Sequence, residues 1–138
     1  CKTLAHTQNY HYQYLERQNS ISKTHTEKGL DIFNAIKNVE TAFKKSEFST
    51  FDLELKRFFI FEGVYSFLAY YAFVKEEETA EILFKNYLRF RKENNIKLAE
   101  ILSYQRFGKN YLLSLSGKKI IFYLFCFFGM QKWIRKII

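Results

Sequence analysis

Residues 58–74 form a run of 17 residues that is apolar around every face of a helix and carries a single charge, Glu62. A helix that is apolar all round is buried, either in protein or in lipid. A glutamate in mid-span costs about 2.5 kcal/mol or more in a bilayer, and the run is at the lower length limit for crossing one. We therefore expect this segment to be the central core helix of a helical bundle.

Amphipathic helices are expected on both sides of this run. Thr26 is a candidate N-cap with Glu27 in the first turn, and Leu30, Phe33, Ile36, Val39 and Phe43 then recur at helical spacing. Ser49 or Thr50 is a candidate cap for the helix that contains the apolar run.

Three further helices are expected after the polar junction at 75–78. The first ends at the polar break 93–95, and Glu81 and Lys85 on it have the spacing of an ion pair. The second covers 96–107 and ends at Gly108. The third begins near Lys118 and forms the end of the chain.

Composition favours a helical fold of one domain. The 138 residues include no proline and five glycines, which argues against an all-β fold, and 48% are hydrophobic, which is enough for a packed core. Two cysteines cannot build a disulfide framework, so a reducing compartment fits best.

The first part of the chain has a different pattern. Tyr10, Tyr12 and Tyr14 alternate with polar residues, which predicts a strand within 4–16, and a polar loop follows up to residue 25. No second strand is evident, and an isolated strand does not hold together in water. Because the sequence also begins at Cys1 rather than Met, we expect a carboxy-terminal piece of a longer protein; a lipidated Cys1 of a mature lipoprotein is the less favoured alternative.

The predicted organisation is therefore mostly α. Residues 1–25 would be the final strand and loop of a preceding domain, and residues 26–138 a bundle of about five helices with a basic amphipathic tail from about 118. Without its sheet partner, such a chain is expected to be poorly soluble.

Spacing alone reveals no complete active site. The sequence has no Asp-x-Asp pair and no Gly-rich phosphate loop, and His6, His11 and His25 lack the spacing of zinc ligands, so no metal site is expected.

One motif stands out: Tyr10-x-Tyr12-x-Tyr14-x-x-Arg17-x-x-Ser20-Ile21. Its aromatic strand delivers Arg17 and Ser20 into a loop just before a capped helix. Arginine holds phosphate oxygens bidentately, and a helix N-terminus supplies amide donors to anions. The alternative is a strand end with solvated polar residues.

This stretch resembles the end of the catalytic domain in family 2 glycosyltransferases, bacterial enzymes that build capsules, exopolysaccharides and O-antigens. Tyr12, Tyr14, Arg17, Ser20 and Ile21 occupy matching places, whereas Leu15 stands where the family often has Arg. The resemblance covers about residues 4–22. It implies the end of a GT-A-type α/β domain, with Tyr12 and Tyr14 on the supporting strand.

The same resemblance implies transfer of a sugar from a nucleotide-diphosphate donor to a glycan or lipid-linked acceptor. Arg17 and Ser20 would lie near the donor diphosphate or the acceptor. Mg or Mn would assist in the full-length enzyme. The catalytic residues would precede this segment, which by itself is expected to hold none and to be inactive.

The charge lies at the end of the chain. Residues 101–138 carry seven Lys and Arg residues and no acidic residue, out of a net charge of +8. An anionic membrane surface is the expected partner, because apolar residues interleaved with these cations would be wasted on a nucleic acid. The membrane-surface candidates are Lys118, Lys119, Lys132, Trp133, Arg135 and Lys136.

Two alternatives remain open for this tail. Its last helix could instead pack onto residues 58–74, with its basic arc in solvent. At the level of function, the alternative to a transferase segment is a stand-alone basic helical module that binds a membrane or a partner protein. The expected location is cytoplasmic, peripheral to the inner face of the cell membrane.

Overall fold

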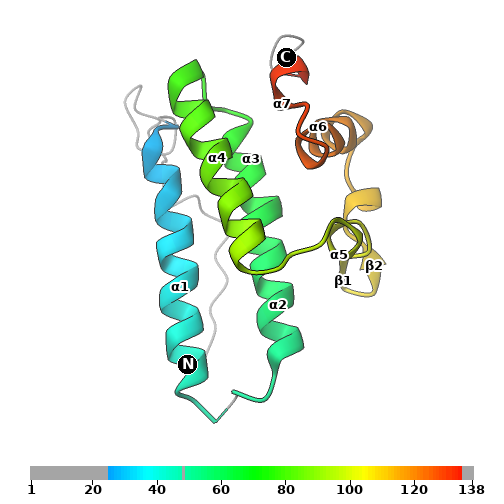
Figure 1. Ribbon diagram of the computed structural model, residues 1–138. Coiled ribbons are helices and arrows are strands. Elements are labelled where there is room, and N and C mark those ends of the chain that lie inside the picture. Colours follow the sequence, from blue (N-terminus) through cyan, green and yellow to red (C-terminus); the bar gives the residue numbers. More distant parts are fainter. Residues whose placement is uncertain (1–24, 48, 135–138) are drawn as a thin grey trace, which may run out of the picture.

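A computed structural model describes residues 25–47 and 49–134, which fold into a mostly helical structure (Figure 1). The helices are α1 (Asp31–Lys44), α2 (Asp52–Ile60), α3 (Phe67–Tyr71), α4 (Glu77–Glu93), α5 (Leu98–Leu102), α6 (Gly117–Phe127) and α7 (Gln131–Ile134). The mostly α class is confirmed. The strand and loop expected before residue 25 lie outside the described residues.

Most of the predicted apolar run is the core of the bundle, but its helix ends at Tyr71 rather than Val74, and Phe73 is 65% exposed. Helices α2 and α3 are joined by a π-helical turn, η3 (Phe61–Ser66), so that the chain stays helical from Asp52 to Tyr71. This continuous segment lies between α1 and α4 in sequence and packs beside both (Figure 1). Val64, Phe67 and Leu68 are completely buried within it. The π-helical turn itself has no counterpart in the sequence prediction.

Helix α1 begins as the sequence indicates. The Thr26 hydroxyl accepts a hydrogen bond from the Lys28 amide over 3.4 Å and caps a short 3-10 helix, η2 (Glu27–Leu30), that leads into α1. The Phe33 ring then packs against Phe67 and stacks on Phe90, with ring centroids 4.6 and 4.8 Å apart. Val39 is exposed, because it lies at the margin of the face centred on Ile36.

The predicted cap of the next helix is wrong. Helix α2 begins at Asp52, and its N-cap is Phe51 rather than Ser49 or Thr50. The Phe51 side chain makes no capping hydrogen bond. Asp52 and Glu54 in the first turn instead place negative charge near the positive end of the helix.

The helix expected over 96–107 is also shorter than predicted. Helix α5 ends at Leu102, and two short strands, β1 (Gln105–Arg106) and β2 (Lys109–Asn110), pair antiparallel after it, with Arg106 opposite Lys109. Gly108 therefore belongs to a hairpin turn and not to a helix end. The Asn110 side chain donates a hydrogen bond to the Leu102 carbonyl over 2.7 Å, which occupies an acceptor at the end of α5. The expectation of no second strand is wrong for this part of the chain.

Residues 98–134 form what we call the C-terminal arm. It comprises α5, the β1–β2 hairpin, a 3-10 turn η4 (Leu112–Ser114), α6 and α7. The arm lies along the flank of the bundle away from α1 (Figure 1).

Candidate functional site

Tyr65, in the π-helical turn η3, connects the bundle to the C-terminal arm. Its hydroxyl donates a hydrogen bond to the Ile101 carbonyl over 2.8 Å, and its own carbonyl accepts one from the Tyr123 hydroxyl over 2.9 Å. Its ring meets Tyr111 edge-on at 4.8 Å and Phe127 at 5.8 Å. One buried residue thus holds both α5 and α6 in place.

Burial raises the pKa of the Tyr65 and Tyr123 hydroxyls well above the ordinary value for tyrosine, and neighbouring tyrosines add to the effect. Burial also raises the pKa of Tyr87, although the nearby Arg91 opposes the rise. Both hydroxyls in the Tyr65 cluster therefore stay protonated at neutral pH. They act as fixed donors that position the arm, not as groups that exchange protons.

A second anchor lies where the described part of the chain begins. The Thr26 amide donates to the Tyr70 hydroxyl over 2.8 Å, and that hydroxyl donates in turn to the Thr26 carbonyl over 2.9 Å. The His25 ring packs against Tyr70 and Phe73, at 4.7 and 5.2 Å between centroids. Gly29 lies against the Tyr70 ring, where a Cβ would clash. The chain is thus held firmly at the residues that follow the Arg17–Ser20 motif.

The motif residues themselves lie outside the described residues. This applies to the two strand tyrosines, Tyr12 and Tyr14, and to the two loop residues, Arg17 and Ser20. Their predicted roles stay predictions.

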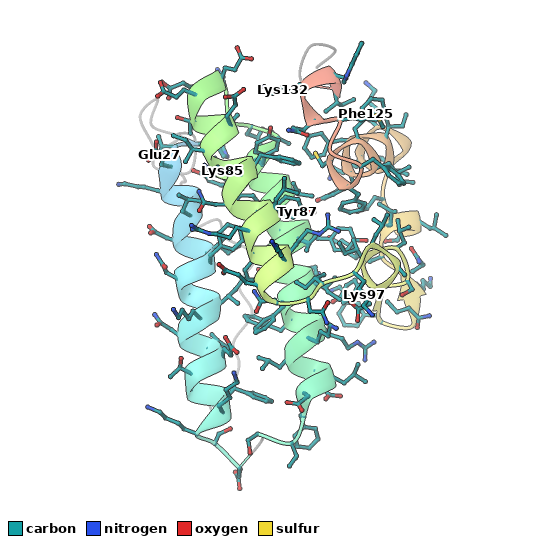
Figure 2. The ribbon with its side chains drawn as sticks, viewed as in Figure 1. Glu27, Lys85, Tyr87, Lys97, Phe125 and Lys132 are labelled. Carbon is teal, nitrogen blue, oxygen red and sulfur yellow. The ribbon has the colours of Figure 1, made fainter. Side chains whose placement is uncertain are left out.

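The six membrane-surface candidates fall into three groups. Lys118 and Lys119 are exposed in the first turn of α6, and Trp133 on α7 is 70% exposed. Lys132, labelled in Figure 2, instead pairs with Glu81 of α4, with 2.5 Å between Nζ and Oε1. The remaining two candidates, Arg135 and Lys136, lie outside the described residues.

The Lys132–Glu81 pair corrects the expectation that Glu81 pairs with Lys85. The hydrogen bond from Lys132 and its charge hold the pKa of Glu81 below its ordinary value, and Glu81 raises the pKa of Lys132 in return. Lys132 reaches Glu81 from α7, so the lysine that is more distant in sequence becomes the partner.

Helix α6 is apolar on two opposite sides. Its inner side buries Phe122, Tyr123, Cys126 and Phe127, and the Tyr123 and Phe127 rings reach Tyr65. Packing of this helix onto the 58–74 segment is therefore confirmed. On the outer side, Ile121 is 51% exposed and Phe128 just after the helix is 58% exposed. Leu124 and Phe125, the latter labelled in Figure 2, are half-buried between them.

The β1–β2 hairpin adds two residues that sequence reasoning missed. The Arg106 guanidinium lies 4.2 Å above the Phe61 ring, while Phe107 at the turn is 91% exposed. An Arg57 hydrogen bond to the Gln105 carbonyl, 3.4 Å long, fixes the hairpin on α2. The signal for it in the sequence was Gly108, because glycine is common both in turns and at helix ends. In the structure its φ is +74°, as a turn requires.

A surface hollow of about 400 Å³ lies between α1 and α4 and is lined by residues of mixed character, including Lys37, Glu40, Arg89 and Glu93. Across residues 25–47 and 49–134, no group of three or more His, Cys, Asp or Glu side chains is arranged to hold a metal ion.

No helix in the described part of the chain combines the length and apolar character needed to cross a membrane. In comparisons with known proteins, no protein-family model, no curated protein and no solved structure matches this chain.

Proposed function

We propose that this chain is the carboxy-terminal helical region of a glycosyltransferase that resembles family 2. The enzyme would move a sugar from a nucleotide-diphosphate donor to a glycan or lipid-linked acceptor in cell-surface polysaccharide synthesis. The observation that carries the proposal is the motif Tyr12-x-Tyr14-x-x-Arg17-x-x-Ser20-Ile21. In this proposal the enzyme works in the cytoplasm, beside the membrane that carries its acceptor.

The anchor at Thr26 supports the proposal physically. Two hydrogen bonds to Tyr70 fix the backbone shortly after the motif, and Tyr70 belongs to the buried central segment. A loop that must hold a diphosphate gains from a rigid attachment, because positioning of catalytic groups is sensitive to small displacements. The helical bundle would serve as that attachment.

The proposed metal ion would be held by residues outside the described part. The described side chains form no suitable ligand group, so Mg or Mn, which would stabilise the departing diphosphate, belongs in this proposal to sequence that precedes the motif.

The coding sequence upstream of Cys1 gives the first test. We expect it to encode roughly 200 further residues, the size of a typical domain, carrying Asp-x-Asp and Glu-Asp segments. A start codon close to Cys1 would overturn the proposal and favour a stand-alone basic helical module.

Kinetics of the full-length protein give the second test. Arg17→Ala is expected to raise the donor KM or lower kcat by at least tenfold, because a charge-assisted contact to phosphate would be lost. Lys37→Ala, a change to an exposed cation on α1, serves as the matched control and should leave both constants unchanged. If Arg17→Ala leaves the donor KM and kcat unchanged, Arg17 does not contact the donor or the acceptor.

The anchor can be tested in the same assay. Tyr70→Phe removes the hydroxyl that binds Thr26 and is expected to lower kcat. Tyr65→Phe, which removes a buried hydroxyl from the middle of the central segment that does not contact Thr26, controls for general loss of stability. Equal losses of kcat in the two variants would show that Tyr70 has no specific positioning role.

A further inference from the structure

We propose that the outer side of the C-terminal arm is a docking surface for an anionic lipid bilayer, which α6 lies on without crossing it. This inference does not depend on the proposed transferase activity. It uses other residues, and its test requires no sugar donor.

The outer side of α6 is the first observation. Ile121, Phe125 and Phe128 follow one another at helical spacing on the side opposite the buried Phe122, Tyr123, Cys126 and Phe127. A helix on the surface of a water-soluble domain normally carries polar residues on that outer side. Here the outer side is also apolar. Leu124 and Phe125 pack partly against the core, but the described part of the chain leaves Ile121 and Phe128 more than half exposed.

The hairpin turn repeats the pattern on the same flank of the bundle (Figure 1). Phe107 projects almost entirely into solvent, and its backbone φ of +52° lies in the left-handed region that bulky residues rarely adopt. An exposed aromatic ring and a left-handed backbone both cost free energy in water. A residue that combines them is therefore a candidate for contact with a less polar surface. Arg106 and Lys109 flank it and would meet lipid phosphates as the ring enters the bilayer boundary.

The positive charge of the C-terminal arm indicates what binds to its outer side. Residues 101–134 contain no acidic residue. Two acids at the arm are already paired: Glu81 of α4 with Lys132, and Glu100 of α5 with Lys56 at 2.6 Å. The exposed cations that remain on the arm are Arg106, Lys109, Lys118 and Lys119. Lys132 contributes little to this surface, because Glu81 neutralises it.

Other occupants fit less well. In a two-fold dimer through this side, the same lysines would face one another without an acid to compensate them. A nucleic acid would satisfy the lysines but leave the exposed side chains of Ile121, Phe128 and Trp133 unused. An anionic bilayer satisfies both the charge and the apolar surface.

Flotation of the full chain with vesicles provides the test. We expect the chain to float with vesicles of phosphatidylcholine mixed with phosphatidylglycerol, to float poorly with phosphatidylcholine alone, and to be released by high salt. Lys118→Glu/Lys119→Glu should lower the partition coefficient by about tenfold or more, and Ile121→Gln/Phe128→Gln by a similar factor. The matched controls, Lys37→Glu/Lys45→Glu on the α1 side and Leu53→Gln on α2, should bind as the parent chain does.

The single Trp of the chain gives a second readout. Trp133 is largely exposed, so its fluorescence should shift to the blue with the anionic vesicles and remain unchanged with the neutral ones. Because each changed side chain is exposed, circular dichroism should report the parent fold in every variant. Failure to float with anionic vesicles would overturn the inference. An equal loss of flotation in the arm variants and the control variants would also overturn it. So would a chain that self-associates through Ile121 and Phe128 but whose flotation does not depend on these two residues.

Discussion

The hydroxyl of Tyr123 donates a hydrogen bond to the main-chain carbonyl of Tyr65 over 2.9 Å, across 58 positions of sequence. Tyr65 uses its own hydroxyl to hold the Ile101 carbonyl at 2.8 Å. These two bonds run from the central π-helical turn to α6 and to α5. The position of the C-terminal arm therefore depends on two buried hydroxyl groups.

Tyr123→Phe should lower the free energy of unfolding by about 1–3 kcal/mol, because the variant keeps the ring and leaves a buried carbonyl without this donor. Urea denaturation followed by circular dichroism measures the loss. Tyr111→Phe is the matched control, since its ring joins the same cluster but its hydroxyl has no hydrogen-bond partner among the described residues. A loss of the same size in Tyr111→Phe would mean that the Tyr123 bond contributes nothing specific.

Gly63 allows α4 to approach the central segment. A Cβ at this position would clash with the ring of Phe90, which itself stacks on Phe33 at 4.8 Å. Gly63→Ala should therefore destabilise the bundle by about 1–3 kcal/mol through overpacking, although alanine is the better helix former.

Gly117→Ala provides the control for this change. Gly117 begins α6, and a Cβ there meets no other atom within 4 Å, so this substitution should be neutral or slightly stabilising in the same denaturation experiment. If both alanine variants gained stability, the close approach at Gly63 would be refuted.

Local pattern was enough to predict the main helices. The spacing of Phe33 and Ile36, the cap at Thr26 and the uninterrupted apolar run each depend on residues that are close in sequence. The same run identifies the buried centre, because a helix without a polar side must be covered.

The details that depend on tertiary packing were not predictable in this way. Glu81 lies four positions from Lys85 but meets Lys132 of α7, which is 51 positions away in the sequence. The hairpin was missed because Phe107 is an unusual residue for a left-handed turn position, where Asn or Gly is the ordinary signal. The roles proposed for Arg17 and Ser20 depend on a family resemblance and not on described coordinates.

The Glu81–Lys132 pair predicts a measurable pH effect. Because the pKa of Glu81 is lower in the folded chain than its ordinary value of 4.5, the pair contributes stability above that value and loses it as pH falls through the folded pKa. Lys132→Gln should raise the pKa of Glu81 towards 4.5 in an NMR titration of the side-chain carboxyl group. Lys85→Gln is the control and should leave this pKa unchanged. An equal rise in the pKa of Glu81 in Lys85→Gln would show that Lys85 also pairs with Glu81.

Phe107 offers a direct test of whether an unfavourable turn residue is kept for binding. Phe107→Asn should stabilise the chain by about 0.5–1 kcal/mol, because Asn tolerates a positive φ at which other side chains cost about 1–2 kcal/mol. Part of that gain is offset by loss of the exposed contact between the ring and Arg106, at 5.3 Å.

The same substitution should weaken flotation with anionic vesicles several-fold, since the aromatic side chain at the turn is lost. Phe107→Leu separates the two effects, because it keeps an apolar side chain and the unfavourable backbone; it should bind more strongly than Phe107→Asn without being more stable than the parent. A Phe107→Asn chain that is less stable than the parent would show that the turn is not strained. Unchanged flotation would show that the ring does not enter the lipid, in which case the docking surface would be limited to α6 and α7.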